Sequence, residues 1–404
     1  MISTRICSMV ALGIFIAFWG AGNVALARSK DKPKPAEEKT DDGEKTGEEA
    51  PAGEDAGGGD AGGEAPAAED TGGGGGGHGA PDGFGKNAKG AGGSPKAVSG
   101  GASAVVSAMK AGGNIQLAKG DYDVPYEDCL IKSNTTFDGG GATLWFPANN
   151  HNGRGVEING TNVIFRNVRI RNAGDNLGFG SAHFKGTKDV LVENVTVSGS
   201  GDDGLSPAYD CKDITIRWTA SLGSTRACFI KYGGTNVTIH HTILSHYFMR
   251  GPLIYGGSVD FRNNLVEHWG DWGSRTESGG KANFVNSTWR FEGFSGGKKD
   301  AAILTMGGSF YSSGNQFIGC SQRTEGSVNS PVVQAPPING QTDAKTSLDA
   351  VLNETTGAGC MPRDAIDKAY LASKAKSVGG KTVPVGLQVE GTNRRGGGSS
   401  KDKK

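Results

Sequence analysis

The chain has 404 residues, of which 69 are glycine and 7% are aromatic, and its formal net charge is zero. The length allows one large domain with accessory segments, and this glycine content argues against a compact helical enzyme. The basic residues form no stripe with interleaved aromatic side chains, so the sequence gives no sign of a nucleic-acid-binding surface.

Residues 1–27 have the pattern of a signal peptide. Arg5 supplies positive charge, residues 9–19 are mostly apolar, and the segment that ends at Ala27 matches a small-residue cleavage site. The apolar run is short for a membrane span. We therefore expect a secreted protein, extracellular or periplasmic, with no transmembrane span after signal removal. Retention of the uncleaved segment as an anchor is the alternative.

Residues 28–95 are first acidic and then rich in glycine and alanine. Within them, residues 37–70 hold thirteen Asp and Glu against two lysines. Such a segment buries too little apolar surface to offset the entropy of ordering it, so we expect a disordered linker. The main domain is then expected at residues 96–390, and residues 391–404 form a basic disordered tail.

A repeat of strand-like runs fills the middle of this domain. The runs are rich in β-branched residues, and their starts lie 27, 24, 23, 22 and 23 residues apart. These starts are Asn162, Asp189, Asp213, Asn236, Ser258 and Lys281. Such a period indicates a solenoid, and the leucine lattice of leucine-rich repeats is absent. The sequence therefore predicts an all-β fold, a right-handed parallel β-helix.

A second column of residues marks the expected corners of this solenoid. Five residues after each start stand Asn167, Asn194, Trp218, His241, Asn263 and Asn286. Asparagine tolerates the left-handed backbone conformation, and its amide can hydrogen-bond to turn backbone groups or to the next coil. We therefore expect a stacked corner at this column.

Helical patterns are scarce. Residues 102–111 are expected to form a short helix that caps the N-terminal end of the solenoid. Residues 343–353 and 363–374 are expected to form a C-terminal helical and loop segment on the other end or on the flank. Caps of this kind protect strand edges that would otherwise be exposed.

The cysteines leave the pairing open. Removal of residues 1–27 leaves Cys129, Cys211, Cys228, Cys320 and Cys360. An odd number means that at least one thiol is free or pairs between chains. The spacing of His and Cys does not match a structural zinc site.

Two arginines, Arg226 and Arg250, are one period apart, so they are expected side by side on adjacent coils. Two neighbouring cations on the outer face suit the carboxylate of a uronate sugar, and the ordinary alternative is solvated surface arginines. The acidic candidates are Glu193 on a strand and the pair Asp202 and Asp203 in a turn. Such oxygen ligands suit Ca²⁺, and the alternative is a plain Asp-Gly turn.

Seven short segments carry a family resemblance. In chain order they are residues 133–142 (SNTTFDGGGA), 189–194 (DVLVEN), 203–205 (DGL), 237–241 (VTIHH), 250–252 (RGP), 263–264 (NN) and 360–367 (CMPRDAID). They resemble, in the same order, the SNxTxDGxGA, NVWIDH, DGL, VTxHHN, RxP, NN and PRDAVD segments of the family-1 polysaccharide lyases, the pectate lyases. The resemblance implies a right-handed parallel β-helix.

The resemblance also implies an activity, β-elimination on polygalacturonate or a related uronate polymer. In this family cations, usually Ca²⁺, neutralise the uronate carboxylate. An arginine then takes the C5 proton, and the 4-O-glycosidic bond breaks. Carried over by position, Arg250 is the base and Arg226 falls near a substrate-binding lysine. Glu193 and Asp203 fall on two Ca²⁺ positions, and Asp202 is a further candidate ligand.

Two more cations are candidates for substrate binding. Lys231 directly follows the strand that Arg226 opens, and Arg275 lies one period beyond Arg250. For Arg275 the alternative is a surface residue paired with Glu277. A free arginine side chain is normally charged, so an arginine base requires neighbouring positive charge that favours its neutral form.

The sequence departs from the family pattern at several places. Pro207 stands where a second Ca²⁺-binding aspartate is expected, and a proline side chain has no carboxylate. Leu253 and Tyr255 occupy places where the family often has arginine, and Asp260 replaces a usual histidine. Asp175, Asp202 or Asp210 are the possible substitutes for the missing Ca²⁺ ligand.

Three functions are compatible with these patterns. The first is a secreted, monomeric lyase whose partner is an anionic polysaccharide. The second, favoured by the altered positions, is a catalytically weakened β-helix that binds glycans or belongs to the cell surface. The third is a glycoside hydrolase, which needs paired carboxylates, and the pair Asp202 and Asp203 is the candidate.

Overall fold

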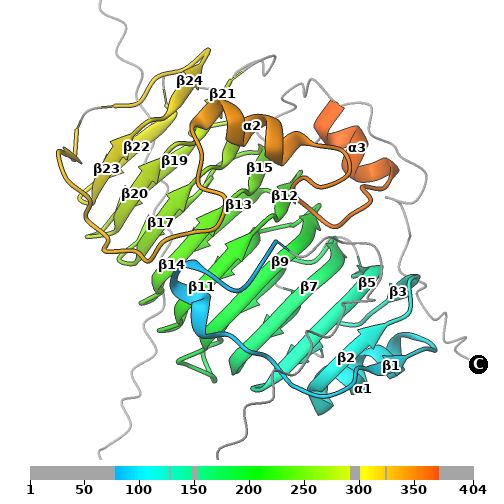
Figure 1. Cartoon of the computed structure of the whole chain (residues 1–404). Coiled ribbons are helices and arrows are strands. Elements are labelled where there is room, and N and C mark those ends of the chain that lie inside the picture. Colours follow the sequence, from blue (N-terminus) through cyan, green and yellow to red (C-terminus); the bar gives the residue numbers. More distant parts are fainter. Residues whose placement is uncertain (1–77, 127–128, 148–152, 292–300, 324, 373–404) are drawn as a thin grey trace, which may run out of the picture. The chain divides into compact units, whose positions relative to one another are not determined.

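The computed structural model describes residues 78–126, 129–147, 153–291, 301–323 and 325–372. Its named strands pair in parallel and form sheets of 17 and 8 strands (Figure 1). The larger sheet consists of two ladders that the long strands β5, β7 and β9 join. This is the right-handed parallel β-helix that the sequence predicts. The expected signal peptide, residues 28–77 and the basic tail lie outside the described residues.

Three ladders of strands therefore run along the coil axis. The first ladder holds β1 (Lys96–Val98), β2 (Gly113–Leu117), the first halves of β5 (Thr135–Trp145), β7 (Thr161–Arg171) and β9 (Lys188–Ser198), then β11 (Lys212–Arg217), β14 (Thr235–His240), β17 (Ser258–Arg262), β20 (Lys281–Val285), β23 (Ser309–Ser313) and β25 (Ser327–Val328). The second ladder holds β3 (Asp121–Asp123), the second halves of β5, β7 and β9, then β12 (Ala220–Leu222), β15 (Ile243–Tyr247), β18 (Leu265–Trp269), β21 (Thr288–Arg290) and β24 (Gln316–Ile318). The third ladder is the smaller sheet: β4 (Cys129–Ile131), β6 (Arg154–Ile158), β8 (Asp175–Phe179), β10 (Asp203–Pro207), β13 (Arg226–Ile230), β16 (Leu253–Tyr255), β19 (Ser274–Glu277) and β22 (Ile303–Met306).

The core is built from stacked aliphatic side chains inside the coil. The strand register places one apolar residue of each coil directly on the next, and each is fully buried. One such row is Val163, Val190, Ile214, Val237, Val259 and Ala282. Branched side chains of this kind pack well on a pleated surface, and burial of their apolar area drives folding. The strand starts read from the sequence are therefore confirmed.

The predicted corner lies between the first and second ladders. All six residues of the predicted column have positive φ, between 48° and 56°: Asn167, Asn194, Trp218, His241, Asn263 and Asn286. The opening residues Asn162, Asp189, Asp213 and Asn236 also have positive φ. The left-handed conformation explains why asparagine dominates the column. Some coils are also joined by side-chain hydrogen bonds, as Nδ2 of Asn236 donates to Asp213 at 2.9 Å.

The helices cover one end and one flank of the coil. Helix α1 (Ala102–Ala111) contacts β1, β2 and β4 at the N-terminal end, as predicted. Helices α2 (Ala344–Leu352) and α3 (Ala365–Ala372) lie against the second ladder, where α2 contacts β21 and α3 contacts β15 (Figure 1). They therefore cover the flank. No helix in the described part of the chain is long and apolar enough to cross a membrane.

Buried ion pairs hold α3 on this flank. Asp367 accepts hydrogen bonds from Arg169 Nε at 3.0 Å and from Arg171 Nη2 at 2.8 Å. The side chains of all three residues are at most 4% exposed. Asp364 pairs with Arg171 at 2.8 Å from a half-buried position. Two charged strand residues are thus neutralised by one helix.

The C-terminal part of the segment expected to be a disordered linker, residues 28–95, is ordered over residues 78–95. The structure describes residues 78–91, the N-terminal strap, which crosses the outer face of the first ladder (blue in Figure 1) and includes the 3-10 helix η1 (Gly83–Asn87). Strap backbone N–H groups donate to side-chain oxygens of Thr238, Thr215, Asn162 and Thr136. A Cβ at Gly85 would lie 2.4 Å from a backbone oxygen. Glycine here permits close docking, which composition alone does not reveal.

The start of the strap is held on the coil by a stack of three aromatic rings and by a contact between Asp82 and His240. His78 stacks on Trp218 with ring centroids 4.1 Å apart, and Trp218 stacks on His241 at 4.4 Å. The Nδ1 atoms of His240 and His241 are 2.8 Å apart, so one of them donates and the other must be unprotonated. Nε2 of His240 lies 3.2 Å from Oδ1 of Asp82 on the strap. Protonation of both Nδ1 atoms is incompatible with this contact.

Acid is expected to loosen the strap. Burial lowers the pKa of His78 and, together with the charge of His240, lowers that of His241 to about 3. An unperturbed histidine titrates near about 6.5, so docking of the strap, which helps to bury His78 and His241, weakens as pH falls below that value. Hydrogen exchange of residues 78–91 at pH 7.5 and pH 4 measures this loss.

Other charged groups also lie near the contact between His240 and His241, so a variant is needed that changes only one histidine. They are Asp82, Glu193 on β9, Arg217 on β11, and Asp260 and Arg262 on β17. His241→Asn restores the residue that this corner prefers and removes the titrating ring, so its strap is expected to depend less on pH. Equal protection at both pH values in the parent protein would contradict the acid effect.

Candidate functional site

Three of the four predicted cations and two of the three predicted acids meet on the third ladder. The register places Asp203 of β10 beside Arg226 of β13. Arg250 precedes β16, and the preceding Met249 forms a bridge with Arg226. Lys231 follows β13 on the same coil as Arg226. Adjacent coils therefore bring Arg226 and Arg250 together, as their spacing of one period predicts.

Ion pairs connect these residues. Asp203 is fully buried, and its two carboxylate oxygens accept hydrogen bonds from Arg250 Nη1 at 2.9 Å and from Lys231 Nζ at 3.0 Å. Asp202 forms an ion pair with Arg226. The two acids thus orient three cations, and none of the three cations is a free surface charge.

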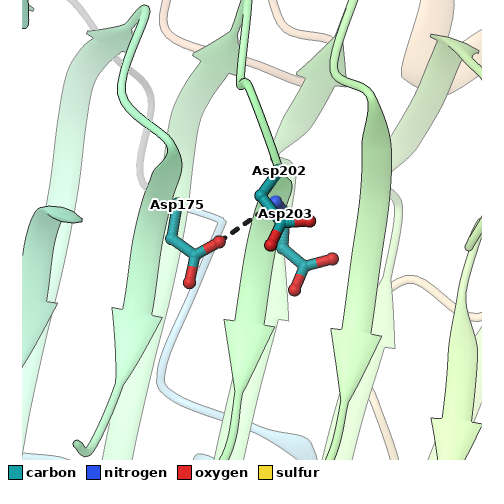
Figure 2. A group of neighbouring side chains, drawn as sticks. All are labelled: Asp175, Asp202 and Asp203. Atoms are coloured by element: carbon teal, nitrogen blue, oxygen red, sulfur yellow. Dashed lines mark hydrogen bonds between the residues drawn. The ribbon is translucent and has the colours of Figure 1, made fainter. Parts of the chain in front are cut away.

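A third carboxylate completes an acidic cluster. Carboxylate oxygens of Asp175, Asp202 and Asp203 lie within 4.8 Å of one another (Figure 2). Asp175 opens β8, one coil before Asp203, and its Oδ1 accepts a hydrogen bond from the backbone N–H of Asp203 at 3.1 Å. Burial, and then the negative charge of Asp203, raise the pKa of Asp175. Two acids in one buried space thus make the ionised form of Asp175 costly.

The two arginines lie close enough for their charges to interact. Burial, and then the positive charge of Arg250, lower the pKa of Arg226. The Arg250 guanidinium lies over the Phe229 ring, 3.9 Å from its centroid, and Lys231 Nζ lies 4.8 Å from the same ring. Phe229 and Asp203 therefore each contact both Arg250 and Lys231.

Glu193 does not belong to this cluster. It lies on β9 in the first ladder, beside Arg166 and Arg217 in the register. Oε2 of Glu193 accepts from Arg217 Nη2 at 2.7 Å, and Arg166 lies 3.7 Å from Oε1. The metal-ligand role predicted for Glu193 is therefore not supported, because its strand faces a different side of the coil. Asp175 takes its place beside Asp202 and Asp203.

Arg275 stands apart from the cluster on the same ladder. It pairs with Glu277 at 2.6 Å and lies over Trp272, 4.4 Å from the ring centroid. In the register it is opposite Leu253, one coil beyond the cluster. The Glu277 pair, which the sequence left open, is formed.

A small pocket adjoins the acidic cluster. Among its lining residues are Arg154, Glu157, Asp175, Tyr209 and Lys231. Arg154 donates to Glu157 at 2.7 Å. No sequence motif marks Arg154, Glu157 or Tyr209 as site residues. Their place beside the cluster follows only from the strand register, in which Arg154 is opposite Asp175.

The positions that depart from the family pattern are also resolved. Pro207 ends β10 and is buried, so the place of an expected carboxylate is filled by a side chain that cannot bind a cation. Asp260 lies in the first ladder and pairs with Arg262 at 2.6 Å, away from the cluster. Of the three substitutes that the sequence offers, Asp175 and Asp202 lie in the cluster with Asp203, whereas Asp210 is exposed and 3.8 Å from Lys185.

The donor set of the cluster fits a hard cation. Three carboxylates within reach of one point are the oxygen ligands that Ca²⁺ prefers. Asp202 and Asp203 are already paired with cationic side chains, whereas Asp175 accepts a hydrogen bond from the backbone N–H of Asp203. Bound Ca²⁺ would thus compete with Arg226, Lys231 and Arg250 for these oxygens.

Comparisons with known proteins agree with the fold. Residues 110–266 match the family model of a right handed beta helix region. A pectate lyase from a Bacillus species, solved in complex with trigalacturonate, aligns with a TM-score of 0.52 at 17% identity, over 69% of this chain and 98% of that one. Pectate lyase II of Xanthomonas campestris aligns at 16% identity with a TM-score of 0.47, over 70% and 100% of the two chains.

A more distant alignment is with the major allergen of cedar pollen. Its identity is 14% and its TM-score 0.47, over 60% of this chain and 80% of the allergen. A search of curated protein sequences gave no match. At these identities the Bacillus lyase establishes a shared fold, the parallel β-helix of pectate lyases, and the residues of the site have to be argued from their own geometry.

Proposed function

We propose that the described domain is a polysaccharide lyase that cleaves polygalacturonate or a related uronate polymer on the outer face of the third ladder. The observation that carries this proposal is the cluster of Arg226, Lys231 and Arg250 with the acids Asp202 and Asp203 on successive coils. Cations fixed in this way suit the carboxylates of a uronate chain. The trigalacturonate bound to the Bacillus lyase of the same fold is of this class.

The proposed reaction is β-elimination. Arg226 and Lys231 neutralise the uronate carboxylate, which acidifies the C5 proton, and Arg250 removes that proton as general base. The C4–O4 bond breaks, a double bond forms between C4 and C5, and O4 takes up a proton from solvent. Bound Ca²⁺ would add positive charge beside the same carboxylate. Since Arg250 is bound to Asp203 at 2.9 Å, the substrate must rearrange this ion pair.

One assay on the full chain separates the candidate reactions. Polygalacturonate is supplied with and without Ca²⁺, and both the ultraviolet absorbance of unsaturated uronides and the number of reducing ends are followed. A lyase raises both. New reducing ends without absorbance would indicate hydrolysis by the pair Asp202 and Asp203 instead, and would contradict the proposed elimination.

A binding module without cleavage is the second candidate. Two observations favour it, the ion pair that engages Arg250 and the replacement of a ligand position by Pro207. Retained binding of polygalacturonate with neither absorbance nor new reducing ends would support this function and contradict the lyase.

The proposed substrate also bears on location. Uronate polymers of this kind are found outside the cell, so the proposal includes export by residues 1–27 and action as a secreted monomer. Detection of a mature N-terminus after Ala27 in the culture medium would support export, and an intact chain retained in the membrane fraction would contradict it.

Calcium is expected to stabilise the protein through the acidic cluster. A ligand that binds only the folded state at about 100 times its Kd adds about 2.7 kcal/mol, so the thermal midpoint should rise with Ca²⁺ and fall again with a chelator. Asp175→Asn is expected to remove most of this shift. Asp210→Asn is the matched control, because Asp210 is exposed and outside the cluster. An equal shift in both variants would place the Ca²⁺ elsewhere.

A further inference from the structure

Two exposed aromatic side chains lie on adjacent coils of the third ladder. In the described residues, the large hydrophobic side chains classed as exposed are Tyr232, Tyr255, Met306 and Val328. Tyr232, 57% exposed, follows β13, and Tyr255, 42% exposed, ends β16 on the next coil. Single exposed apolar residues are ordinary, but neighbouring ones often mark a binding surface. These two side chains adjoin the proposed site through Lys231.

The aromatic residues form a collar around Lys231, defined as Phe229, Tyr232 and Tyr255. Lys231 Nζ lies 4.8 Å from the Phe229 ring centroid and 5.7 Å from that of Tyr232. Tyr255 meets Phe229 edge to face with centroids 6.5 Å apart. Tyr209, one coil earlier, packs on Tyr232 at 5.2 Å. A partly exposed cation is thus bordered by aromatic faces on neighbouring coils.

The backbone at Tyr232 is costly for a tyrosine. Its φ is 48°, and Tyr209 has the same left-handed conformation at 52°. A side chain with a Cβ is unfavourable in this conformation, and Asn or Gly adopts it more easily. Most corner positions of the first ladder use Asn or Asp, and the exceptions Trp218 and His241 lie in a stack of rings. A strained tyrosine that is more than half exposed is poorly explained by folding, which points to a binding role.

Tyr255 supports the same conclusion from the sequence. It occupies a place where the resemblance to pectate lyases leads us to expect a cation. Compared with an arginine, a tyrosine at this position offers a similar area for contact with a ligand but carries no charge. The surface beside Lys231 is therefore apolar. An apolar aromatic face suits the C–H face of a pyranose ring, whereas its carboxylate needs a cation.

We propose that Tyr232 and Tyr255 form a platform for sugar rings beside Lys231. Each tyrosine packs against the apolar face of a pyranose, and Lys231, which uses one of its three N–H donors on Asp203, gives another to the uronate carboxylate. The polymer then extends from Lys231 over Tyr232 and Tyr255 on adjacent coils. The platform rests on the proposed function and specifies its ligand as an acidic pyranose chain that extends beyond the reacting residue.

The test uses the full chain with Arg250→Ala, which prevents turnover, and trigalacturonate as the probe in calorimetric titration. Tyr232→Asn is expected to weaken binding by at least tenfold while the thermal midpoint stays equal or rises, because Asn relieves the strained backbone. Tyr232→Phe keeps the ring and is expected to bind like the parent. Tyr255→Thr is expected to weaken binding, and Val328→Thr, an exposed residue on β25, is the control.

The outcomes separate the platform from the function on which it rests. Trigalacturonate binding that Tyr232→Asn and Tyr255→Thr leave unchanged would overturn the platform and leave the proposed function standing. Failure of the wild-type chain both to bind trigalacturonate and to cleave polygalacturonate would overturn the platform and the proposed function together. Weaker binding accompanied by a matching fall in the thermal midpoint of Tyr232→Asn would show a structural role and would also overturn the platform.

Discussion

Arg250→Ala is expected to lower the rate of unsaturated uronide release from polygalacturonate by about 10²- to 10⁴-fold, the usual contribution of a general base. The side chain that is lost is the one that the cluster positions, between Asp203 at 2.9 Å and the Phe229 ring at 3.9 Å. The measurement is the initial rate of absorbance increase at saturating polymer. Binding should weaken far less, because Arg226 and Lys231 remain.

Arg275→Ala is the matched control for this variant. Arg275 is a cation on the same ladder that also lies over an aromatic ring, but its partner is Glu277 and it stands one coil beyond the cluster. Its loss should change the rate by less than the loss of Arg250. Arg250→Lys keeps a cation that can pair with Asp203, so a low rate in this variant would separate proton transfer from charge. Equal rates for Arg250→Ala and wild type would rule out Arg250 as the base.

The fold could be predicted because the same short pattern of strand and corner residues recurs in each coil. A coil of fixed length returns each strand to the same ladder, so the period appears directly in the spacing of residues such as Asn162 and Asp189. The corner could be predicted because left-handed backbone selects asparagine at Asn167 and Asn194. Where the column changes to Trp218 and His241, the reason is long-range, since both stack in line with His78 of the strap.

The site could be predicted only in part, for a different reason. Spacing of one period correctly places Arg226 beside Arg250, because both lie near the start of strands in one ladder. Spacing does not show which ladder a strand joins, so the resemblance alone places Glu193 near Asp203, whereas Glu193 lies beside Arg217 in the first ladder. Asp175, one of the substitutes that the sequence offers, lies one coil before Asp203, where the pairing of β8 with β10 brings it close.

The largest expected effect on stability comes from Asp367→Ala. Asp367 is 1% exposed and accepts hydrogen bonds from Arg169 and Arg171, whose side chains are 4% and 1% exposed. Removal of the carboxylate leaves two buried guanidinium groups with Asp364 as their remaining acidic partner. Breaking a buried pair from one side costs about 3–5 kcal/mol, because the remaining charge is no longer compensated. The free energy of unfolding from a urea titration measures this loss.

Two further variants test whether the loss of stability in Asp367→Ala comes from the buried ion pairs. Asp349→Ala removes an acid from α2 whose ion pair with Lys345 is exposed, and such pairs contribute little, so its unfolding curve should nearly match the parent. Asp367→Asn keeps the shape but removes the charge, and its NH2 group replaces one of the two oxygens that accept from Arg169 and Arg171, so it measures the loss of charge and of one acceptor without leaving a cavity. A cost below 1 kcal/mol for Asp367→Ala would contradict the network. In that case apolar contacts such as those of Val351 with Leu222 and Ile243 would hold this flank without the ion pairs.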